Sequence, residues 1–247
     1  MLSLTLELLQ NVLASTLTDS MEPLLTTSMF DPRRVPVLAA ESVLPPVQRS
    51  GLEPQALRSR FATPPQWVPE LREEAPMTDQ APCPASVLVP LVMREQLTVL
   101  LTLRAAHLPT HAGQIAFPGG KQDDADPSPV HAALREAQEE VGLDTQHIEV
   151  LGTLPVYRTG TAFVVTPVVA LVSPHRPWQP NPHEVADVFE VPLDYLMNPA
   201  HHRRHELEWE GRLRSWYSIP YDDGGQERWI WGATAGMLRN FYRFLSA

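Results

Sequence analysis

The sequence has little cysteine and little lysine, and both shortages narrow the classes of site that need to be considered. Cys83 is the single cysteine among 247 residues. One thiol excludes an intramolecular disulfide framework and a cysteine-based metal cluster. Lys121 is the single lysine, so arginine supplies nearly all of the positive charge. The arginine bias by itself indicates no mechanism.

Positive charge is also scarce in total. The chain has 19 Lys and Arg against 29 Asp and Glu, which gives a formal net charge of −10. This balance argues against non-specific nucleic-acid binding, which needs a basic face. No apolar run reaches the length of a membrane span. The apolar start of the chain lacks a basic region and is interrupted by Glu7, which argues against a secretory signal. We therefore expect no nucleic-acid or membrane partner and a cytoplasmic location.

Proline divides the chain into two regions. Its length suits one large domain or one domain with an extension, and a hydrophobic content of 43% suffices for a core. Residues 29–84 are rich in proline, with one helical candidate at 54–61, and offer too few apolar residues for a core of their own. Residues 1–28 either form a short amphipathic helix with a polar tail or precede the true start. We expect an N-terminal extension over 1–84 and a main domain over 85–247.

The main domain contains several apolar runs of strand length. Strands are expected at 87–92, 98–103, 148–154 and 163–172, and further helices at 193–197 and 233–245. A turn at 94–96 would join the first two strands into a hairpin. The mixture of strands and helices predicts an α/β fold.

Residues 113–143 contain a helix with two opposed faces. The glutamates Glu136, Glu139 and Glu140 share one arc of about 100°. The opposite arc is apolar and consists of Val130, Ala133, Leu134, Ala137 and Val141. Like charges three and four residues apart repel one another, and a bound cation would relieve that repulsion. Taken alone, the Glu-x-x-Glu-Glu pattern is most simply explained as a solvent-exposed helix face without a ligand.

The surroundings of this helix favour a cation site. Either Asp126 or Ser128 supplies the N-cap, each followed by a proline, and Gly142 ends the helix. Gly119 and Gly120 precede it, after a short apolar run, so strand, glycine turn, loop and helix form one unit. Three carboxylates with a backbone carbonyl suit a hard divalent cation such as Mg²⁺ or Mn²⁺.

This segment resembles the Nudix box, the signature of hydrolases that cleave nucleoside diphosphates linked to another moiety. The matching residues are Gly120, Arg135, Glu136, Ala137, Glu139, Glu140, Gly142 and Leu143. Asp126 stands where the family has a glutamate, and one extra residue separates it from Arg135. We therefore expect Asp126 to be a helix cap rather than a metal ligand.

The flanking segments resemble the coenzyme A pyrophosphatase branch of that family. The resemblance covers about residues 84–245 and is carried by 100–104, 107–108, 111–120, 184–185, 189–193 and 230–235. It implies a Nudix α/β/α sandwich with a mixed β-sheet and hydrolysis of coenzyme A or its derivatives, a small-molecule nucleotide partner. Another Nudix substrate, such as ADP-ribose or a dinucleotide, and a non-catalytic Nudix module remain alternatives. The proline-rich arm and the C-terminal helix leave a homodimer open.

The resemblance also assigns roles to residues around the box. It implies that Glu136, Glu139 and Glu140, with the carbonyl of Gly120, bind Mg²⁺ or Mn²⁺. Arg135 is expected to orient a glutamate through a charge-assisted hydrogen bond rather than to touch substrate. The general base is either one of these glutamates or Glu184, and the sequence does not decide between them.

Four basic residues are expected to contact the substrate. Arg104 and His111 lie in otherwise apolar segments, and we favour phosphate recognition over a surface role for both. Lys121, next to Gly120, is placed to reach a phosphate, although a solvated loop lysine fits nearly as well. Arg158 either lines the cleft or is simply exposed. The basic cluster at 201–205 lacks acidic partners at ligand spacing and is interpreted as a solvated loop. Contact of its arginines with a 3′-phosphate is the lesser alternative.

Overall fold

The computed structural model describes residues 31–40, 44–209 and 211–247. It divides into two compact units, Met1–Val35 and Pro36–Ala247. The described part of the first unit contains one 3-10 helix, η1 (Pro32–Arg34), whose N-terminus is capped by the carboxylate of Asp31. The short helix expected within residues 1–28 lies outside the described residues.

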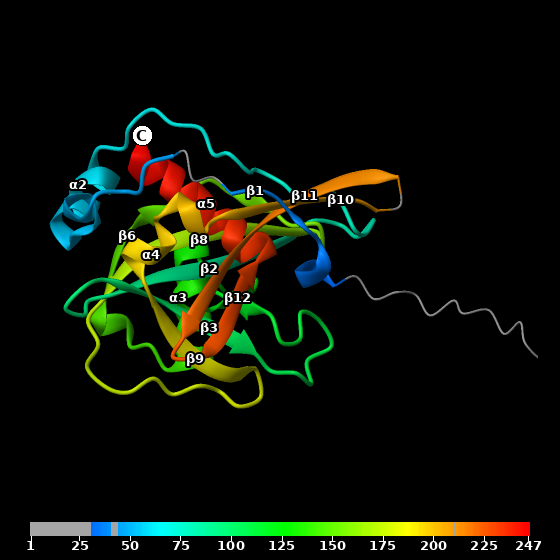
Figure 1. The fold of residues 1–247 in the computed structure, drawn as a ribbon. Helices are drawn as coiled ribbons and strands as arrows, with labels where there is room; N and C mark the ends of the chain where they lie inside the picture. The colour runs from blue at the N-terminus through cyan, green and yellow to red at the C-terminus, as the bar shows by residue number, and fades with distance from the viewer. Residues whose placement is uncertain (1–30, 41–43, 210) are drawn as a thin grey trace, which may run out of the picture. The chain divides into compact units, whose positions relative to one another are not determined.

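The second unit contains two β-sheets and the helices that cover them (Figure 1). Its strands are β1 (Val37–Ala40), β2 (Cys83–Val92), β3 (Thr98–Arg104), β4 (Ile115–Ala116), β5 (Gly119–Lys121), β6 (Ile148–Thr153), β7 (Tyr157–Arg158), β8 (Phe163–Val172), β9 (Val185–Pro192), β10 (Arg203–Trp209), β11 (Arg212–Asp223) and β12 (Gln226–Trp231). Its α-helices are α2 (Pro54–Ala62), α3 (Pro129–Val141), α4 (Leu193–Leu196) and α5 (Gly232–Ser246), and its 3-10 helices are η2 (Arg49–Leu52), η3 (Thr145–His147) and η4 (Pro199–His201). Among these helices, none is both long enough and apolar enough to cross a bilayer.

The larger sheet has eight strands and is mixed. Its central pair, β2 and β8, is parallel over ten residues, from Cys83 opposite Phe163 to Val92 opposite Val172. The main path runs β4-β3-β2-β8-β6, while β5 also pairs with β2, β7 with β8 and β9 with β3. All pairings other than that of β2 with β8 are antiparallel. The 163–172 strand has the bounds that the sequence predicted.

The two faces of this sheet belong to different cores because successive side chains of a strand point to opposite sides. Leu88 and Val92 of β2 lie in a core shared with the apolar face of α3. Val89 and Leu91 lie in the larger core, which includes α5 and residues of β11 and β12. Helices therefore lie on both sides of a mixed sheet, and the predicted α/β fold is confirmed.

The second sheet has the order β1-β10-β11-β12, is antiparallel throughout and was not anticipated from the sequence. The interpretation of residues 201–205 as a solvated loop is wrong. β10 pairs with β11 from Arg203 opposite Ser218 onward, which carries His202 and His205 into the interior. The ring of His205 stacks on that of Trp216, with 5.5 Å between the ring centroids. Pairing with a distant strand therefore buries this segment although its residues are polar.

The proline-rich region between residues 44 and 82 packs on the larger core. Leu57 of α2 is fully buried there. Two aromatic rings from this region contact Phe244 of α5, namely Phe61 at 4.8 Å and Trp67 at 5.3 Å between ring centroids. This arm therefore folds as part of the same compact unit as α5.

Candidate active site

The glycine turn before α3 brings backbone close to the carboxylates of the helix. A Cβ on Gly119 would collide with the carbonyl oxygen of Ser86 and the Cα of Val87, and its φ of +155° disfavours other residues. A Cβ on Gly120 would lie 2.6 Å from the carboxylate carbon of Glu136. Both glycines therefore permit a close approach, of β5 to β2 and of the turn to the helix.

The three glutamates of α3 differ in exposure, which ranks them from the inside of the site to the outside. The side chain of Glu140 is 4% exposed, that of Glu136 15% and that of Glu139 54%. Glu140 accepts a hydrogen bond of 3.1 Å from the backbone N–H of Gly119. Its other carboxylate oxygen lies 3.8 Å from Nη1 of Arg104. The cluster therefore reaches from the protein interior to solvent.

The two inner carboxylates are electrostatically unfavourable in their charged form. Burial raises the pKa of Glu140 to about 7, against the lowering effects of the Gly119 hydrogen bond and the Arg104 charge. Burial likewise raises the pKa of Glu136, and the charge of Glu139 adds to that effect, while Arg135 opposes it. Desolvated carboxylates that repel one another form the oxygen-only donor set that a hard divalent cation prefers.

Arg135 holds this carboxylate cluster in place. It forms two hydrogen bonds to Asp126, of 2.9 and 3.2 Å, and donates to the backbone carbonyl of Lys121 at 3.2 Å. Its Nη1 donates to Glu136 and to Glu139, both at 3.1 Å. The hydrogen bonds to Asp126 are the main reason why the pKa of Arg135 is raised. A guanidinium occupied by so many protein acceptors positions the glutamates rather than substrate.

The expectation that Asp126 caps α3 is wrong. The N-cap is Ser128, whose hydroxyl accepts from the backbone N–H of His131, and Pro129 follows at the first helical position. Asp126 instead accepts from Arg135 and from the backbone N–H of Asp123. The hydrogen bond from Arg135 lowers the pKa of Asp126. Gly142 ends the helix in the left-handed conformation, with φ of 68°, as predicted.

We expect Arg135→Lys to weaken divalent-metal binding about 10- to 100-fold, the usual range for a residue that orients metal ligands. A lysine ammonium cannot replace a planar fork that bridges Asp126, Glu136 and Glu139 at once. Titration of Mn²⁺, followed by electron paramagnetic resonance, measures the effect. Arg58→Lys is the matched control, because Arg58 also holds a carboxylate with two hydrogen bonds, but at the surface. Equal Mn²⁺ affinity in the two variants would contradict the positioning role.

Two further predicted residues lie beside the inner carboxylates. Arg104 ends β3, and its backbone pairs with Val185, the first residue of β9. Glu184 precedes that residue, and its carbonyl accepts from the backbone N–H of Ala105 at 2.9 Å. The charge of Glu184 raises the pKa values of Glu136 and Glu140, which places its carboxylate near both. The structure therefore brings residues 104 and 184 to the carboxylate cluster.

The other three predicted substrate contacts have separate surroundings. Lys121 is exposed, and its carbonyl belongs to the Arg135 network. His111 has a φ of 56° and bonds to Oε1 of Gln114 at 2.9 Å. Arg158 is exposed, and its backbone pairs with that of Arg72 and Glu74 in the arm. The described contacts thus connect Lys121 to Arg135 of the Nudix box, and Arg158 to the proline-rich arm.

Glu74 is a charged residue near His111 that the sequence analysis did not identify. Its carboxylate accepts from the hydroxyl of Tyr157 at 3.1 Å and from the backbone N–H of Gly160 at 2.9 Å. Burial raises the pKa of Glu74. The hydrogen bonds from Gly160 and Tyr157 are the main opposing effects, followed by the charges of His111 and Arg214. Glu74 lies in the proline-rich arm, where no local motif marks it, so only the fold connects it to residue 111.

Several known proteins are similar to this chain. Residues 83–210 match the family model described as NUDIX domain. The proteins named "Uncharacterized Nudix hydrolase NudL" from Salmonella paratyphi B and Salmonella newport are each 43% identical over 159 residues, which is 63% of this chain and 79% of theirs. Among solved structures, the Nudix hydrolase RenU from M. smegmatis is 27% identical, with a TM-score of 0.39 over 47% of this chain and 73% of that one.

The family match extends over more than half of the chain and contains the glycine turn, α3 and Glu184. The NudL relatives are covered over most of their length at an identity well above chance. The chain therefore belongs to the NUDIX domain family and is a Nudix hydrolase.

Proposed function

We propose that this protein cleaves the pyrophosphate of coenzyme A or a coenzyme A derivative with the help of Mg²⁺ or Mn²⁺. The products would be adenosine 3′,5′-bisphosphate and 4′-phosphopantetheine. The observation that carries the chemistry is the desolvated cluster of Glu136, Glu139 and Glu140 on one face of α3. The observation that supports this substrate is the likeness of residues 100–120 to the extended motif of coenzyme A pyrophosphatases.

The residues at the cluster fit a divalent cation of the kind that Nudix hydrolases generally use. Glu136, Glu139 and Glu140 would hold it, together with the carbonyl of Gly120, whose Cα lies against the Glu136 carboxylate. When bound, such an ion withdraws charge from phosphoryl oxygens and lowers the pKa of a coordinated water. Arg135 keeps Glu136 and Glu139 in position for binding.

The proposed reaction forms one bond from a water oxygen to phosphorus and breaks the bond from that phosphorus to the bridging oxygen. The water proton needs an acceptor at neutral pH. Glu184 is one candidate, because it enters the cluster on the loop before β9 while the box glutamates lie on α3. A glutamate of the box is the other. Replacing Glu184 with glutamine separates these two alternatives by its effect on kcat.

The substrate is a polyanion, whereas the protein has a formal net charge of −10. The site therefore needs local positive charge besides the cation. Arg135 is occupied by protein acceptors, so Arg104, at 3.8 Å from Glu140, is the proposed source of this charge. Its buried Nε has no hydrogen-bond partner among the described residues. His111, Lys121 and Arg158 are proposed as further contacts for phosphate groups.

A panel of substrates tests the proposal. Purified protein is incubated with Mg²⁺ or Mn²⁺ and with coenzyme A, its oxidised form, an acyl derivative, ADP-ribose or a dinucleotide, and the products are separated by chromatography. We expect kcat/KM for a coenzyme A compound to exceed that for ADP-ribose by at least about 10-fold, or 1.4 kcal/mol of transition-state discrimination.

The alternatives predict other results from the same panel. Equal rates on ADP-ribose and coenzyme A would reject the coenzyme A assignment and retain pyrophosphate hydrolysis. A non-catalytic module would bind nucleotides without releasing product from any of them. The presence of all three box glutamates is the feature that favours a catalytic site over such a module.

A further inference from the structure

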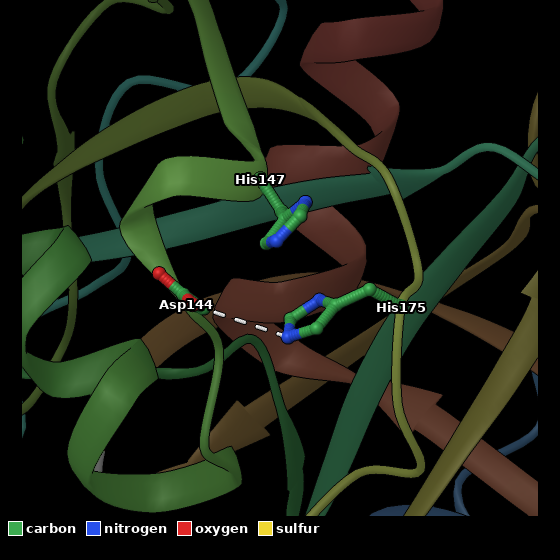
Figure 2. A group of neighbouring side chains, drawn as sticks. All are labelled: Asp144, His147 and His175. Carbon is green, nitrogen blue, oxygen red and sulfur yellow. Dashed lines mark ion pairs between the residues drawn. The ribbon is translucent and has the colours of Figure 1, made fainter.

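Two histidines and an aspartate meet on the surface beyond the C-terminal end of α3. They are Asp144, which caps η3, His147, the last residue of η3, and His175, which follows β8. One potential ligand atom from each lies within 4.8 Å of the other two. Figure 2 shows the two imidazole rings face to face, with the carboxylate beside the edge of His175. None of these residues belongs to the carboxylate cluster on α3.

From this arrangement we propose that Asp144, His147 and His175 form a second metal site, one that binds Zn²⁺ or a chemically similar transition metal. Two imidazole nitrogens and one carboxylate oxygen are donors that Zn²⁺ accepts readily. Mg²⁺ prefers oxygen ligands and keeps much of its water, so it is a poor match to this set. The two sites therefore differ in the metal that each would select.

Backbone contacts hold the three residues together in advance. β6 and β8 are paired, and the register places Ile148 opposite Val172, next to the segments that carry the histidines. The pairing continues outward, because the N–H of Ser173 donates to the carbonyl of His147 at 2.9 Å. Because the backbone segments that carry the ligands are already neighbours, metal binding requires reorientation of side chains but little ordering of the backbone.

The carboxylate of Asp144 is also oriented by the backbone. Its Oδ1 accepts from the N–H of Gln146 at 3.0 Å, as the cap of η3. The other oxygen, Oδ2, lies 3.9 Å from Nε2 of His175. A hydrogen bond from outside the site that fixes a ligating carboxylate is a common feature of metal centres.

The ordinary explanation is an ion pair with a stacked neighbour, and its energetic contribution would be small. The separation of 3.9 Å between Asp144 and His175 exceeds that of a hydrogen bond, and both side chains are about one-third exposed. Exposed ion pairs of this kind contribute little to stability. The rings of His147 and His175 lie 3.8 Å apart, inclined by 19°. Tetrahedral Zn²⁺ places ligand atoms about 3.4 Å apart. The nitrogen lone pairs of two stacked rings lie in nearly parallel planes, so at least one imidazole must turn about its Cβ–Cγ bond before both rings can face one ion.

Zn²⁺ at this position would fasten the loop between β8 and β9 to the end of α3. His175 lies near the start of that loop, which already donates backbone hydrogen bonds from Gln179 and Asn181 to the carbonyls of Val141 and Glu140. A metal that binds only the folded chain stabilises it in proportion to its occupancy. Bound Zn²⁺ should therefore raise the melting temperature.

The test is a calorimetric titration of the untagged full-length protein with ZnCl₂ in a large excess of Mg²⁺, which competes for the proposed site at the carboxylate cluster. We expect one Zn²⁺ to bind, and His147→Gln or His175→Gln to weaken binding at least about 10-fold. His183→Gln changes an exposed histidine of the same loop and should have no effect. Asp144→Asn keeps an oxygen for the η3 cap, so its loss of Zn²⁺ affinity cannot be attributed to misfolding.

A second readout identifies the ligands directly. The ring nitrogen resonances of two histidines should shift on Zn²⁺ addition in nitrogen-labelled protein, and these signals should be the ones missing in the His147 and His175 variants. Glu140→Gln should leave Zn²⁺ binding unchanged. The proposal is rejected if no Zn²⁺ binds, if the histidine variants bind it normally, or if Glu140→Gln alone removes it. Each of these outcomes is independent of whether the protein hydrolyses coenzyme A.

Discussion

Replacing Glu140 with glutamine is expected to lower metal-dependent turnover by more than about 100-fold, because changing a residue outside the ligand shell already costs 10- to 100-fold. Glu140 is the most buried carboxylate of the cluster and is held by Gly119. Glutamine has nearly the same shape and can accept the same hydrogen bond. It lacks the charge that a divalent cation requires, so the loss should appear in both Mn²⁺ affinity and kcat.

The same substitution should not unfold the protein. Burial raises the pKa of Glu140 to about 7, so the charged carboxylate is disfavoured in the metal-free fold. A raised pKa means that this residue's contribution to stability is present at acid pH and is lost as the pH rises through about 7. Glutamine does not ionise, so the Glu140→Gln variant does not lose stability in this way as the pH rises. We therefore expect the metal-free variant to be at least as stable as the native protein at pH 8, as measured by thermal unfolding.

The matched control for this prediction is Glu95→Gln, which removes a charge from the exposed turn between β2 and β3. It should leave turnover and Mn²⁺ affinity within about 2-fold of the native values, since changes at such sites are nearly neutral. Turnover by Glu140→Gln close to that of the control would reject the assignment of the active site. Loss of both turnover and thermal stability would indicate a structural role instead.

The sequence predicts those helices and strands whose apolar and polar residues follow a regular spacing along the chain. The apolar run at 163–172 is β8 with the same bounds, and the periodic segment at 233–245 lies within α5. The opposed faces of α3 appear as predicted, with Ala133 and Ala137 buried and Glu139 exposed. In each case the side chains that share one environment recur at the spacing of their own helix or strand, so the local pattern is informative.

The second sheet could not be predicted because its strands depend on distant partners. β10 reads Arg-Arg-His-Glu-Leu-Glu-Trp, which is charged and lacks a run of β-branched residues. Its formation depends on β1 and β11, whose sequences give no indication of the pairing. Burial of His202 lowers its pKa to about 4, and its Nε2 contacts the carbonyl of Leu196. A neutral buried histidine cannot be distinguished from a solvated one by sequence alone.

The active site shows the same limit within a few residues. The motif identifies Glu136, Glu139 and Glu140. The role expected for Asp126 is wrong because Asp126-Pro127 and Ser128-Pro129 are both suitable N-caps in the sequence. The structure decides for Ser128 by the hydrogen bond to His131, which leaves Asp126 for Arg135. The spacing of residues can indicate that Asp126 belongs to the site. Which donor its carboxylate bonds to depends on the geometry of the loop.

The largest effect expected on stability comes from neutralising Glu70 in the arm. Arg239 of α5 is 1% exposed, and its Nε donates to Glu70 at 2.9 Å. Tyr217 donates to the other carboxylate oxygen at 2.6 Å. Removing one partner of a fully buried ion pair usually costs about 3–5 kcal/mol, because the remaining charge stays desolvated. The Glu70 side chain is 28% exposed, so the lower end of this range applies. Glu70→Gln should therefore lower the free energy of unfolding by about 3 kcal/mol at pH 7.

The pH dependence gives this prediction a distinctive signature. Burial alone would raise the pKa of Glu70, but the hydrogen bonds from Tyr217 and Arg239 outweigh it, and the pKa is lowered. A lowered pKa means that the stabilisation is present above about 4.3, the usual pKa of glutamate in unfolded chains. This stabilisation is lost as the pH falls through the pKa of Glu70 in the folded protein. The difference between Glu70→Gln and the native protein should therefore shrink in acid.

Urea unfolding followed by tryptophan fluorescence at pH 7 and at several acid pH values measures both effects. Glu73→Gln, an exposed neutralisation three residues along the same arm, controls for the loss of one negative charge. The backbone of Leu71 is also bonded to Asn240, at 3.0 Å and 2.6 Å, so the arm remains attached to α5 and the variant should still fold. Equal stability of the two variants at pH 7 would show that the Glu70 charge does not contribute to the attachment of the arm to α5.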